Sequence, residues 1–166
     1  MKKKVWIFNH YATDTMLDHG GRHYWFAKYL TRAGYDVRIF CASTVHDTDI
    51  NFDVGESGYC EKMVDGLKYT LIQTSNYVGN GKSRVKNMYQ FYRRIFRVIK
   101  NYEKPDVIFA SSVHPLTLLA GIKIAKKLGV KCICEVRDLW PESLVEYEII
   151  PRNHILTKLM YRGERR

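Results

Sequence analysis

Short apolar runs alternate with longer amphipathic stretches along this chain, and that alternation restricts its fold more than any other feature. The apolar runs lie at residues 4–8, 36–42, 106–111 and 130–136, and a polar loop follows each of them. Runs of this kind are typical of strands buried on both faces. The alternation predicts an α/β, Rossmann-like domain with a mainly parallel sheet, helices on both faces and right-handed crossovers.

The stretches between the runs predict three helices, over residues 21–33, 85–102 and 116–128, with Gly34 and Gly129 as stop signals after the first and third. In the first helix the side chains expected to face the core are Trp25, Phe26, Tyr29, Leu30 and Ala33. In the second they are Val85, Met88, Tyr89, Tyr92, Ile95, Phe96 and Ile99.

The remaining connections carry turn signals. Asp65-Gly66 separates two short runs, 62–64 and 67–73, and predicts a small β-hairpin at the edge of the sheet. Residues 44–59 are polar without helical period, so we expect a long irregular connection there. Residues 76–84 contain two glycines and predict a flexible loop.

At 166 residues with 46% hydrophobic content, the chain is long enough for one core. We expect one Rossmann-like domain over residues 1–150. The apolar helical face in residues 151–166 ends without a closing element, which suggests a truncated helix leading toward a C-terminal domain of a longer protein. No apolar run approaches the roughly 20 residues that span a bilayer, and the first residues do not read as a secretory signal. A cytoplasmic location is expected.

Four cysteines occur, and Cys132 and Cys134 alternate with apolar residues inside a predicted strand. Their spacing does not match the usual zinc patterns, so buried, reduced cysteines and no metal site are expected. The formal net charge of +10 favours polyanionic partners such as anionic lipid surfaces, phosphorylated substrates or nucleic acid. A basic, simply solubilising surface explains the charge equally well.

Ligands of parallel sheets bind beyond the carboxyl ends of the strands, here residues 9–21, 111–115 and 137–143. Gly20 and Gly21 stand at the entry to the first helix, where backbone N–H groups and the helix dipole favour an anion. A plain turn is the alternative. The Gly-x-Gly-x-x-Gly pattern is absent and residues 41–43 supply no acidic group for a ribose, so no dinucleotide cofactor is expected.

The other two loops hold the remaining candidate site residues. His114 follows a strand and is placed to contact a substrate hydroxyl or phosphate, or only to shape the turn. Arg137 can bind a phosphate or carboxylate in a bidentate manner, and Asp138 can accept a hydrogen bond from a sugar hydroxyl, unless the two form a purely structural ion pair. Trp140 can stack on a sugar face or fill the core, and Glu142 adds another acidic group.

These residues in this order resemble retaining, GT-B-fold glycosyltransferases of the group-1/family-4 type that build bacterial surface polysaccharides, especially the N-acetylfucosamine-type transferases. The resemblance rests on Gly20-Gly21, residues 30–37, Asp65-Gly66, residues 105–108 and 111–115, and above all residues 137–143. It implies a two-domain enzyme in which this half binds the acceptor and a C-terminal domain binds most of the nucleotide-sugar. No metal is usually needed, and this domain alone should be inactive.

By the same resemblance, Gly20 and Gly21 would face the donor phosphates or the transferred sugar, and Asp138 with Arg137 would line the reaction centre. Many relatives carry His where Arg137 stands, so no role for an imidazole carries over. His114, Trp140 and Glu142 would contact a lipid-linked or polysaccharide acceptor in capsular or other surface polysaccharide biosynthesis.

The resemblance also suggests a peripheral membrane role for the second helix, because such acceptors are often presented at the inner face of the cytoplasmic membrane. Its basic residues would meet anionic headgroups, or form a solvated face: Lys82, Arg84, Lys86, Arg93, Arg94 and Arg97. Two alternatives stay open, a GT-B-like nucleotide-sugar 2-epimerase and a non-catalytic membrane or polyanion adaptor. Nucleic acid is the weakest partner because no recognised binding motif accompanies the charge.

Overall fold

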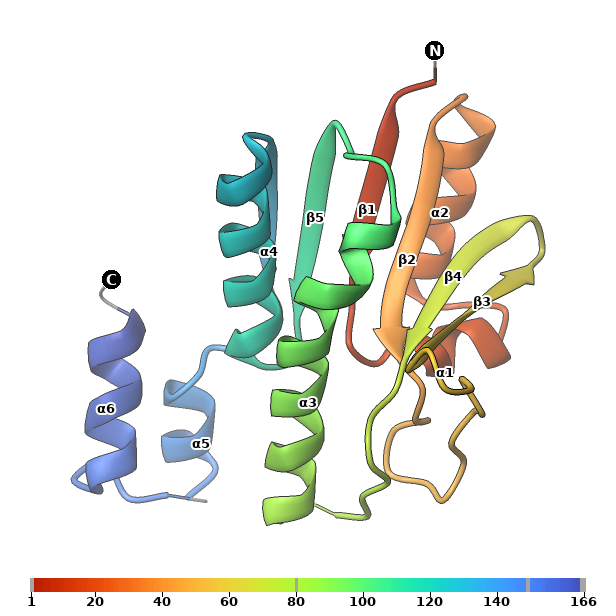
Figure 1. Cartoon of the computed structure of the whole chain (residues 1–166). Helices are drawn as coiled ribbons and strands as arrows, with labels where there is room; N and C mark the ends of the chain where they lie inside the picture. Colours follow the sequence, from red (N-terminus) through yellow and green to blue (C-terminus); the bar gives the residue numbers. More distant parts are fainter. Residues whose placement is uncertain (1, 80, 149, 165–166) are drawn as a thin grey trace.

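Among residues 2–79, 81–148 and 150–164, which the computed structural model describes, six strands form one sheet in the order β3-β4-β2-β1-β5-β6 (Figure 1). The strands are β1 (Lys4–Phe8), β2 (Asp36–Ala42), β3 (Tyr59–Val64), β4 (Leu67–Ile72), β5 (Val107–Ser112) and β6 (Lys131–Val136). All neighbours pair in parallel except β3 and β4, which form the antiparallel hairpin that Asp65-Gly66 predicts. The α/β, Rossmann-like fold with a mainly parallel sheet is confirmed.

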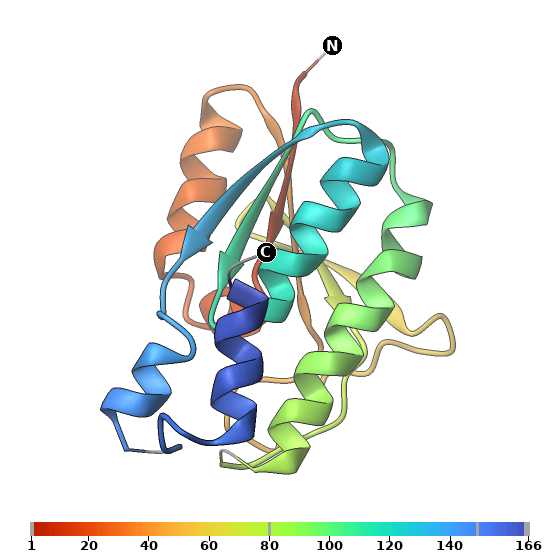
Figure 2. The same ribbon diagram turned by 90° about the vertical axis from the view of Figure 1, so that its left-hand side faces the viewer.

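Helices cover both faces of the sheet. Helix α2 (Arg22–Arg32) lies on one face, and α3 (Lys82–Val98) and α4 (Pro115–Leu128) lie side by side on the other (Figures 1 and 2). A 3-10 turn, Ile99–Asn101, extends α3. Three shorter helices, α1 (Ala12–Leu17), α5 (Glu142–Glu146) and α6 (Ile155–Glu164), lie toward the carboxyl ends of the strands (Figure 2).

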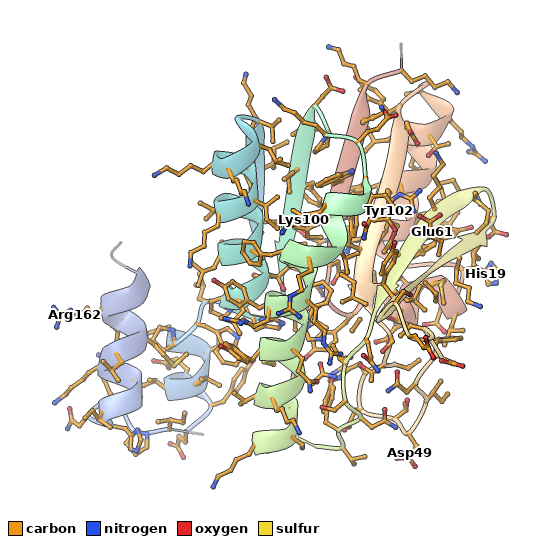
Figure 3. The ribbon with its side chains drawn as sticks, viewed as in Figure 1. His19, Asp49, Glu61, Lys100, Tyr102 and Arg162 are labelled. Atoms are coloured by element: carbon orange, nitrogen blue, oxygen red, sulfur yellow. The ribbon has the colours of Figure 1, made fainter. Side chains whose placement is uncertain are left out.

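Alternation along the strands builds two cores. On β1, Trp6 and Phe8 face α3 and α4, whereas Val5 and Ile7 face α2. The first core is aromatic: Trp6 and Phe40 meet edge to face with ring centroids 5.2 Å apart. Tyr102, which Figure 3 labels after the 3-10 turn, packs edge to face on Phe40, and its hydroxyl accepts a hydrogen bond from Thr70. Both faces of the central strands are therefore covered by buried, mainly apolar side chains.

Helix α4 approaches the sheet closely at Gly121. A Cβ there would lie 2.5 Å from Ala110 Cβ and 3.3 Å from Cys132 Sγ, so glycine is needed for contact between α4 and the two strands β5 and β6. At the other end of the helix, Gly129 adopts the left-handed conformation with φ of 63°. This confirms the predicted cap.

Three predicted loops contain helix instead. Residues 9–21 include α1, α3 begins at Lys82 inside the predicted loop 76–84, and α5 begins at Glu142 inside the predicted loop 137–143. Helices α1 and α5 are too short to show an apolar period. Helix α1 packs into the core through Ala12 and Met16. The prediction of loop was wrong for these residues.

The predicted core stripe of α2 was also wrong in part. Trp25 and Tyr29 are 43% and 60% exposed, and Phe26 is exposed as well, whereas His23, Tyr24 and Ala27 are buried. The polar residue His23 can lie on the inner face because Asn9 and Glu135 form hydrogen bonds with its ring. A hydrophobic pattern does not reveal such partners. In α3, Val85 and Tyr89 are likewise exposed, and the inner face contains Asn87 and Phe91 beside the predicted Met88 and Ile95.

Strand β6 departs from the expected burial. It forms the edge of the sheet beyond β5, and Ile133 is 54% exposed. All four cysteines are free thiols, as expected, and Cys41 is buried; Cys134, however, is exposed, so its predicted burial was wrong. Cys134 is exposed because it lies on β6, the edge strand of the sheet.

Candidate functional site

The switch point of the sheet lies between β1 and β5. From β1 the chain moves toward β2 and the hairpin, and from β5 it moves the opposite way to β6. In open α/β sheets the crevice beyond the carboxyl ends of such strands is where ligands bind. Asn9 follows β1 here and Ser111 lies near the end of β5, so both face this crevice edge.

A directional chain of hydrogen bonds starts at Asn9. The backbone N–H of Tyr11 donates to Asn9 Oδ1 over 3.2 Å, which fixes the amide so that its Nδ2 donates to His23 Nδ1 over 2.8 Å. Because Nδ1 accepts, the neutral imidazole carries its proton on Nε2, which donates to Glu135 Oε2 over 3.1 Å. Asn9 and His23 are almost fully buried, and burial lowers the pKa of His23 although Glu135 opposes the shift.

Glu135 is the point where three elements meet, its own strand β6, strand β5 and helix α2. Its Oε2 also accepts the hydroxyl proton of Ser111 over 2.5 Å, and its Oε1 pairs with the guanidinium of Arg22. Burial raises the pKa of this carboxyl, but the hydrogen bonds from Ser111 and Arg22 and the proximity of His23 outweigh it, so the pKa lies below its ordinary value. Glu135 is therefore an ionised, largely buried carboxylate at the end of β6.

The amino terminus of α2 lies next to this carboxylate. Gly21 is its N-cap residue with φ of 79°, and a Cβ there would lie 2.8 Å from Thr15 Cγ2. The first turn contains no acidic residue and no side-chain cap, and its first residue is Arg22. Free N–H groups, the helix dipole and a guanidinium thus combine at one place, an arrangement that suits an anion.

Arg137 and Asp138 lie beside this arrangement, beyond the end of β6. The backbone N–H of Arg137 donates to Ser112 Oγ over 3.1 Å, which ties the loop to the end of β5, and both side chains are exposed. Asp138 lines a mainly apolar hollow of about 400 Å³ between α4, the loop after β6 and α6. The hollow is lined by Ser112, Pro115, Leu118, Leu119, Ile122, Val136, Asp138, Leu139, Trp140 and Met160.

The three residues expected at the acceptor differ in their surroundings. Trp140 is half-buried and lines the hollow with Asp138. Glu142 pairs with Arg152 over 2.7 Å and accepts a hydrogen bond from Tyr161, so it joins α5 to α6. His114 is 1% exposed and its Nε2 lies 2.6 Å from His10 Nδ1, beneath the surface of the crevice.

The basic helix α3 also divides into two groups. Four predicted membrane-facing residues, Lys82, Lys86, Arg93 and Arg97, are exposed. Arg84 is half-buried and donates from Nε to the hydroxyl of Tyr11 over 3.2 Å, and Arg94 donates to the carbonyl of Gln73 over 2.6 Å. The face is thus partly structural and partly solvated.

The network of Arg22, His23, Glu135, Asn9 and Ser111 was missed as a site by the sequence analysis. Its signal was present: a polar residue follows the apolar strand β1 directly, and polar residues occupy the next-to-last positions of β5 and β6. The register explains the meeting, because Ser111 lies opposite Glu135 in the β5–β6 pair and Phe8, before Asn9, lies opposite Ala110. Strand order alone decides which of these ends are neighbours, and it is not encoded in any local pattern.

Residues 24–166 match the family model described as Glycosyltransferase Family 4. The chain belongs to glycosyltransferase family 4. The matched range includes Glu135, Arg137 and Asp138, whereas Gly20 and Gly21 lie before it. Family 4 glycosyltransferases are typically retaining enzymes, and membership implies a nucleotide-sugar donor. No curated protein matches the chain.

Within the part of the chain that the structure describes, no helix is long and apolar enough to cross a membrane.

Proposed function

We propose that this family 4 domain is the acceptor-side half of a retaining glycosyltransferase that moves a hexosyl residue from a nucleotide-sugar to a lipid-linked or polysaccharide acceptor. The proposal rests on two features at the carboxyl ends of the strands, on opposite faces of the β5–β6 pair. One is the uncapped, cationic amino terminus of α2 beside Gly20 and Gly21, and the other is the hollow lined by Asp138 and Trp140. A donor phosphate and a sugar acceptor suit these two features in turn.

The donor end of the site is built from backbone and charge. Gly20 and Gly21 would lie close to the diphosphate, and their lack of side chains permits that approach. Arg22 supplies a delocalised cation that pairs well with phosphate oxygens. Arg137, exposed beside the same edge, would stabilise negative charge that develops on the leaving diphosphate during transfer.

The acceptor end combines one carboxylate with an apolar wall. Asp138 would accept a hydrogen bond from an acceptor hydroxyl, and Trp140 would pack on a sugar face. His114 contacts His10 and Glu142 pairs with Arg152, so these two residues would support the acceptor site through other side chains. The apolar residues of α4 suit an acceptor that carries a lipid.

The partner domain and the membrane complete the proposal. A C-terminal domain of the same enzyme would bind the rest of the nucleotide-sugar, with reaction in the cleft between the two. The exposed part of α3 would rest on the inner, anionic membrane surface, where lipid-linked acceptors are found, in a pathway for surface or capsular polysaccharide.

The test is transfer by the native polypeptide from a panel of UDP- and GDP-hexoses to a lipid-pyrophosphate-linked sugar. We expect one donor to give a product with retained anomeric configuration, and Asp138→Asn to reduce kcat about 100-fold or more, as loss of a group in the reaction centre does. Asp49→Asn, on the loop after β2 (Figure 3), is the matched control. Absence of transfer from every donor overturns the proposal, and sugar epimers formed without acceptor would favour the 2-epimerase.

A further inference from the structure

We propose that Cys132 and Cys134 form a reversible intrachain disulfide by exchange with a low-molecular-weight disulfide of the glutathione class. Both residues lie on the edge strand β6, and their Sγ atoms are 3.8 Å apart. Both are free thiols in the structure. The inference assigns a modification site outside the proposed transfer reaction, and it does not depend on that reaction.

The spacing of the two cysteines along the strand permits a bridge. A strand rises about 3.2–3.4 Å per residue, so the Cα atoms of residues two apart lie about 6.4–6.8 Å from each other. This is the upper end of the range of about 4.4–6.8 Å that disulfides span. The two side chains point to the same face of the sheet. Closing the sulfur–sulfur distance from 3.8 Å to about 2.05 Å therefore needs side-chain rotation and a small bend of the strand.

The edge position of β6 allows that bend. Within the part of the chain that the structure describes, β6 pairs only with β5, where Ala110 lies opposite Cys134. Bends and bulges concentrate at sheet edges, because a strand that is paired on one side has fewer hydrogen bonds to adjust than a central strand. A pair of cysteines with the same spacing on β1 or β2 would lack this freedom.

Solvent access gives the two thiols different roles. Cys134 is exposed, whereas Cys132 is half-buried against α4, where a Cβ at Gly121 would lie 3.3 Å from its Sγ. Burial and the neighbouring Cys134 raise the pKa of the Cys132 thiol to about 12, so this thiol stays protonated at neutral pH. Because the thiolate is the attacking form, Cys134 reacts first with a dissolved disulfide and Cys132 completes the bridge.

The exchange balances in atoms and electrons. Cys134 loses its proton to solvent, and its sulfur attacks one sulfur of oxidised glutathione, which breaks the glutathione S–S bond and releases a first glutathione thiolate. With Cys134 no longer ionisable, part of the rise in the pKa of Cys132 disappears. The Cys132 sulfur then gives up its proton and attacks Cys134 Sγ, which releases a second glutathione thiolate. Both released thiolates take up protons, so the cysteine pair is oxidised and oxidised glutathione is reduced.

The charge of the chain favours an oxidant of this class. The formal net charge is +10, and Arg137, three residues after Cys134, is exposed. Oxidised glutathione has more carboxylates than amines and is therefore an anion at neutral pH. A positively charged protein attracts such an anion and raises the rate of encounter.

The experiment is incubation of the chain with oxidised glutathione at neutral pH without oxygen, followed by an acid quench and intact-mass spectrometry. We expect a product that has lost the two thiol hydrogens and carries no glutathione. Its tryptic peptide 132–137 should no longer react with N-ethylmaleimide, and dithiothreitol should restore that reaction. Cys60→Ser, which removes a half-buried cysteine from β3, is the matched control and should leave formation of the bridge unchanged.

Two single variants test the order of attack. Cys132→Ser removes the second thiol, so Cys134 should keep glutathione as a mixed disulfide. Cys134→Ser removes the exposed thiol, so Cys132 should react at least about tenfold more slowly than Cys134 does in Cys132→Ser. Thermal unfolding verifies that each variant is folded.

The wild-type product decides the proposal. A bridge between residues 132 and 134 that forms in wild type and in Cys60→Ser, and in neither of the other variants, supports it. A wild type that stays reduced, that accumulates only the mixed disulfide, or that forms its bridge through Cys41 or Cys60 overturns it. Faster reaction of Cys132 than of Cys134 overturns the order of attack.

Discussion

His10 Nδ1 and His114 Nε2 lie 2.6 Å apart in the interior. His10 is the second residue after β1, and His114 is the N-cap residue of α4. The His10 ring stacks between Tyr11 and Phe91, with centroids 4.5 Å and 4.7 Å away. Burial lowers the pKa of His10 well below its ordinary value and lowers the pKa of His114 to about 3, and positive charge on Arg84 adds to both shifts. The pair is therefore neutral in the folded protein at neutral pH.

This neutral pair predicts that the protein loses stability in mild acid. Both histidines take up protons in the unfolded chain near pH 6.5 but stay neutral in the folded state, for His114 down to about pH 3. The unfolded state then binds more protons, so the free energy of unfolding falls as the pH decreases through this window, by up to about 1.4 kcal/mol per pH unit for each histidine. Urea unfolding at intervals between pH 7.5 and 5 measures the slope.

His114→Gln should lower the free energy of unfolding at pH 7.5 and make its pH dependence shallower, because one titrating group is gone. Asn101→Gln, an exposed substitution that removes no titrating group, is the control and should leave the slope as it is. Parallel curves for wild type and His114→Gln would show that the pair does not cause the acid sensitivity.

Gly121→Ala should destabilise the fold by about 1–3 kcal/mol, the usual cost of an added methyl group in a packed interior. The new Cβ would overlap Ala110 Cβ at 2.5 Å, and that atom cannot move away without its backbone. Ala110→Gly in the same chain should recover part of the loss. Gly81→Ala, whose Cβ would meet no atom within 4 Å, is the control; it should cost less, because it only replaces glycine by alanine at the N-cap of α3. Thermal and urea unfolding of the wild type and the three variants decides the prediction.

Gly20→Ala should weaken nucleotide-sugar binding while leaving the fold intact. An added Cβ would lie 3.5 Å from the carbonyl of Asp18, an ordinary contact, so only a closely approaching ligand would be displaced. Gly21→Ala should weaken nucleotide-sugar binding and also lower the stability of the fold. The backbone φ at Gly21 is +79°, and the added Cβ would lie 2.8 Å from Thr15 Cγ2. Calorimetric binding and thermal unfolding distinguish the two, and equal donor affinity for wild type and Gly20→Ala would remove Gly20 from the site.

The order of elements was predictable from the sequence, because each rests on a local pattern. Strand β2 was predicted at the same residues that the structure shows, and the hairpin at Asp65-Gly66 and the cap at Gly129 followed from the backbone needs of turns and helix ends. The exposed face of α2 was not predictable in this way. Its inner side holds His23, whose burial depends on Glu135, a residue brought near only by the order of the strands.

The candidate site shows the same division. Gly20, Gly21, Arg137 and Asp138 were identified because their loops follow predicted strands, and the structure places them at one edge of the sheet. The pairing of His114 with His10 and of Glu142 with Arg152 was not visible, since each joins residues from separate segments. Sequence reasoning therefore identified the loops that carry the candidate residues, and the contacts among those residues required the folded arrangement.

The division of helix α3 into bound and exposed basic residues predicts which of them meet a membrane. Lys86, Arg93 and Arg97 are exposed, so Lys86→Gln, Arg93→Gln and Arg97→Gln together should weaken binding to vesicles that contain anionic lipid by about 1 kcal/mol per residue. Lys3→Gln, Lys104→Gln and Lys131→Gln, exposed at the opposite edge of the sheet, remove the same charge and serve as the control. Sedimentation with vesicles measures both triple variants. Equal losses in the two would mean that net charge, and not this helix, governs association; a loss confined to the first would place α3 at the membrane surface.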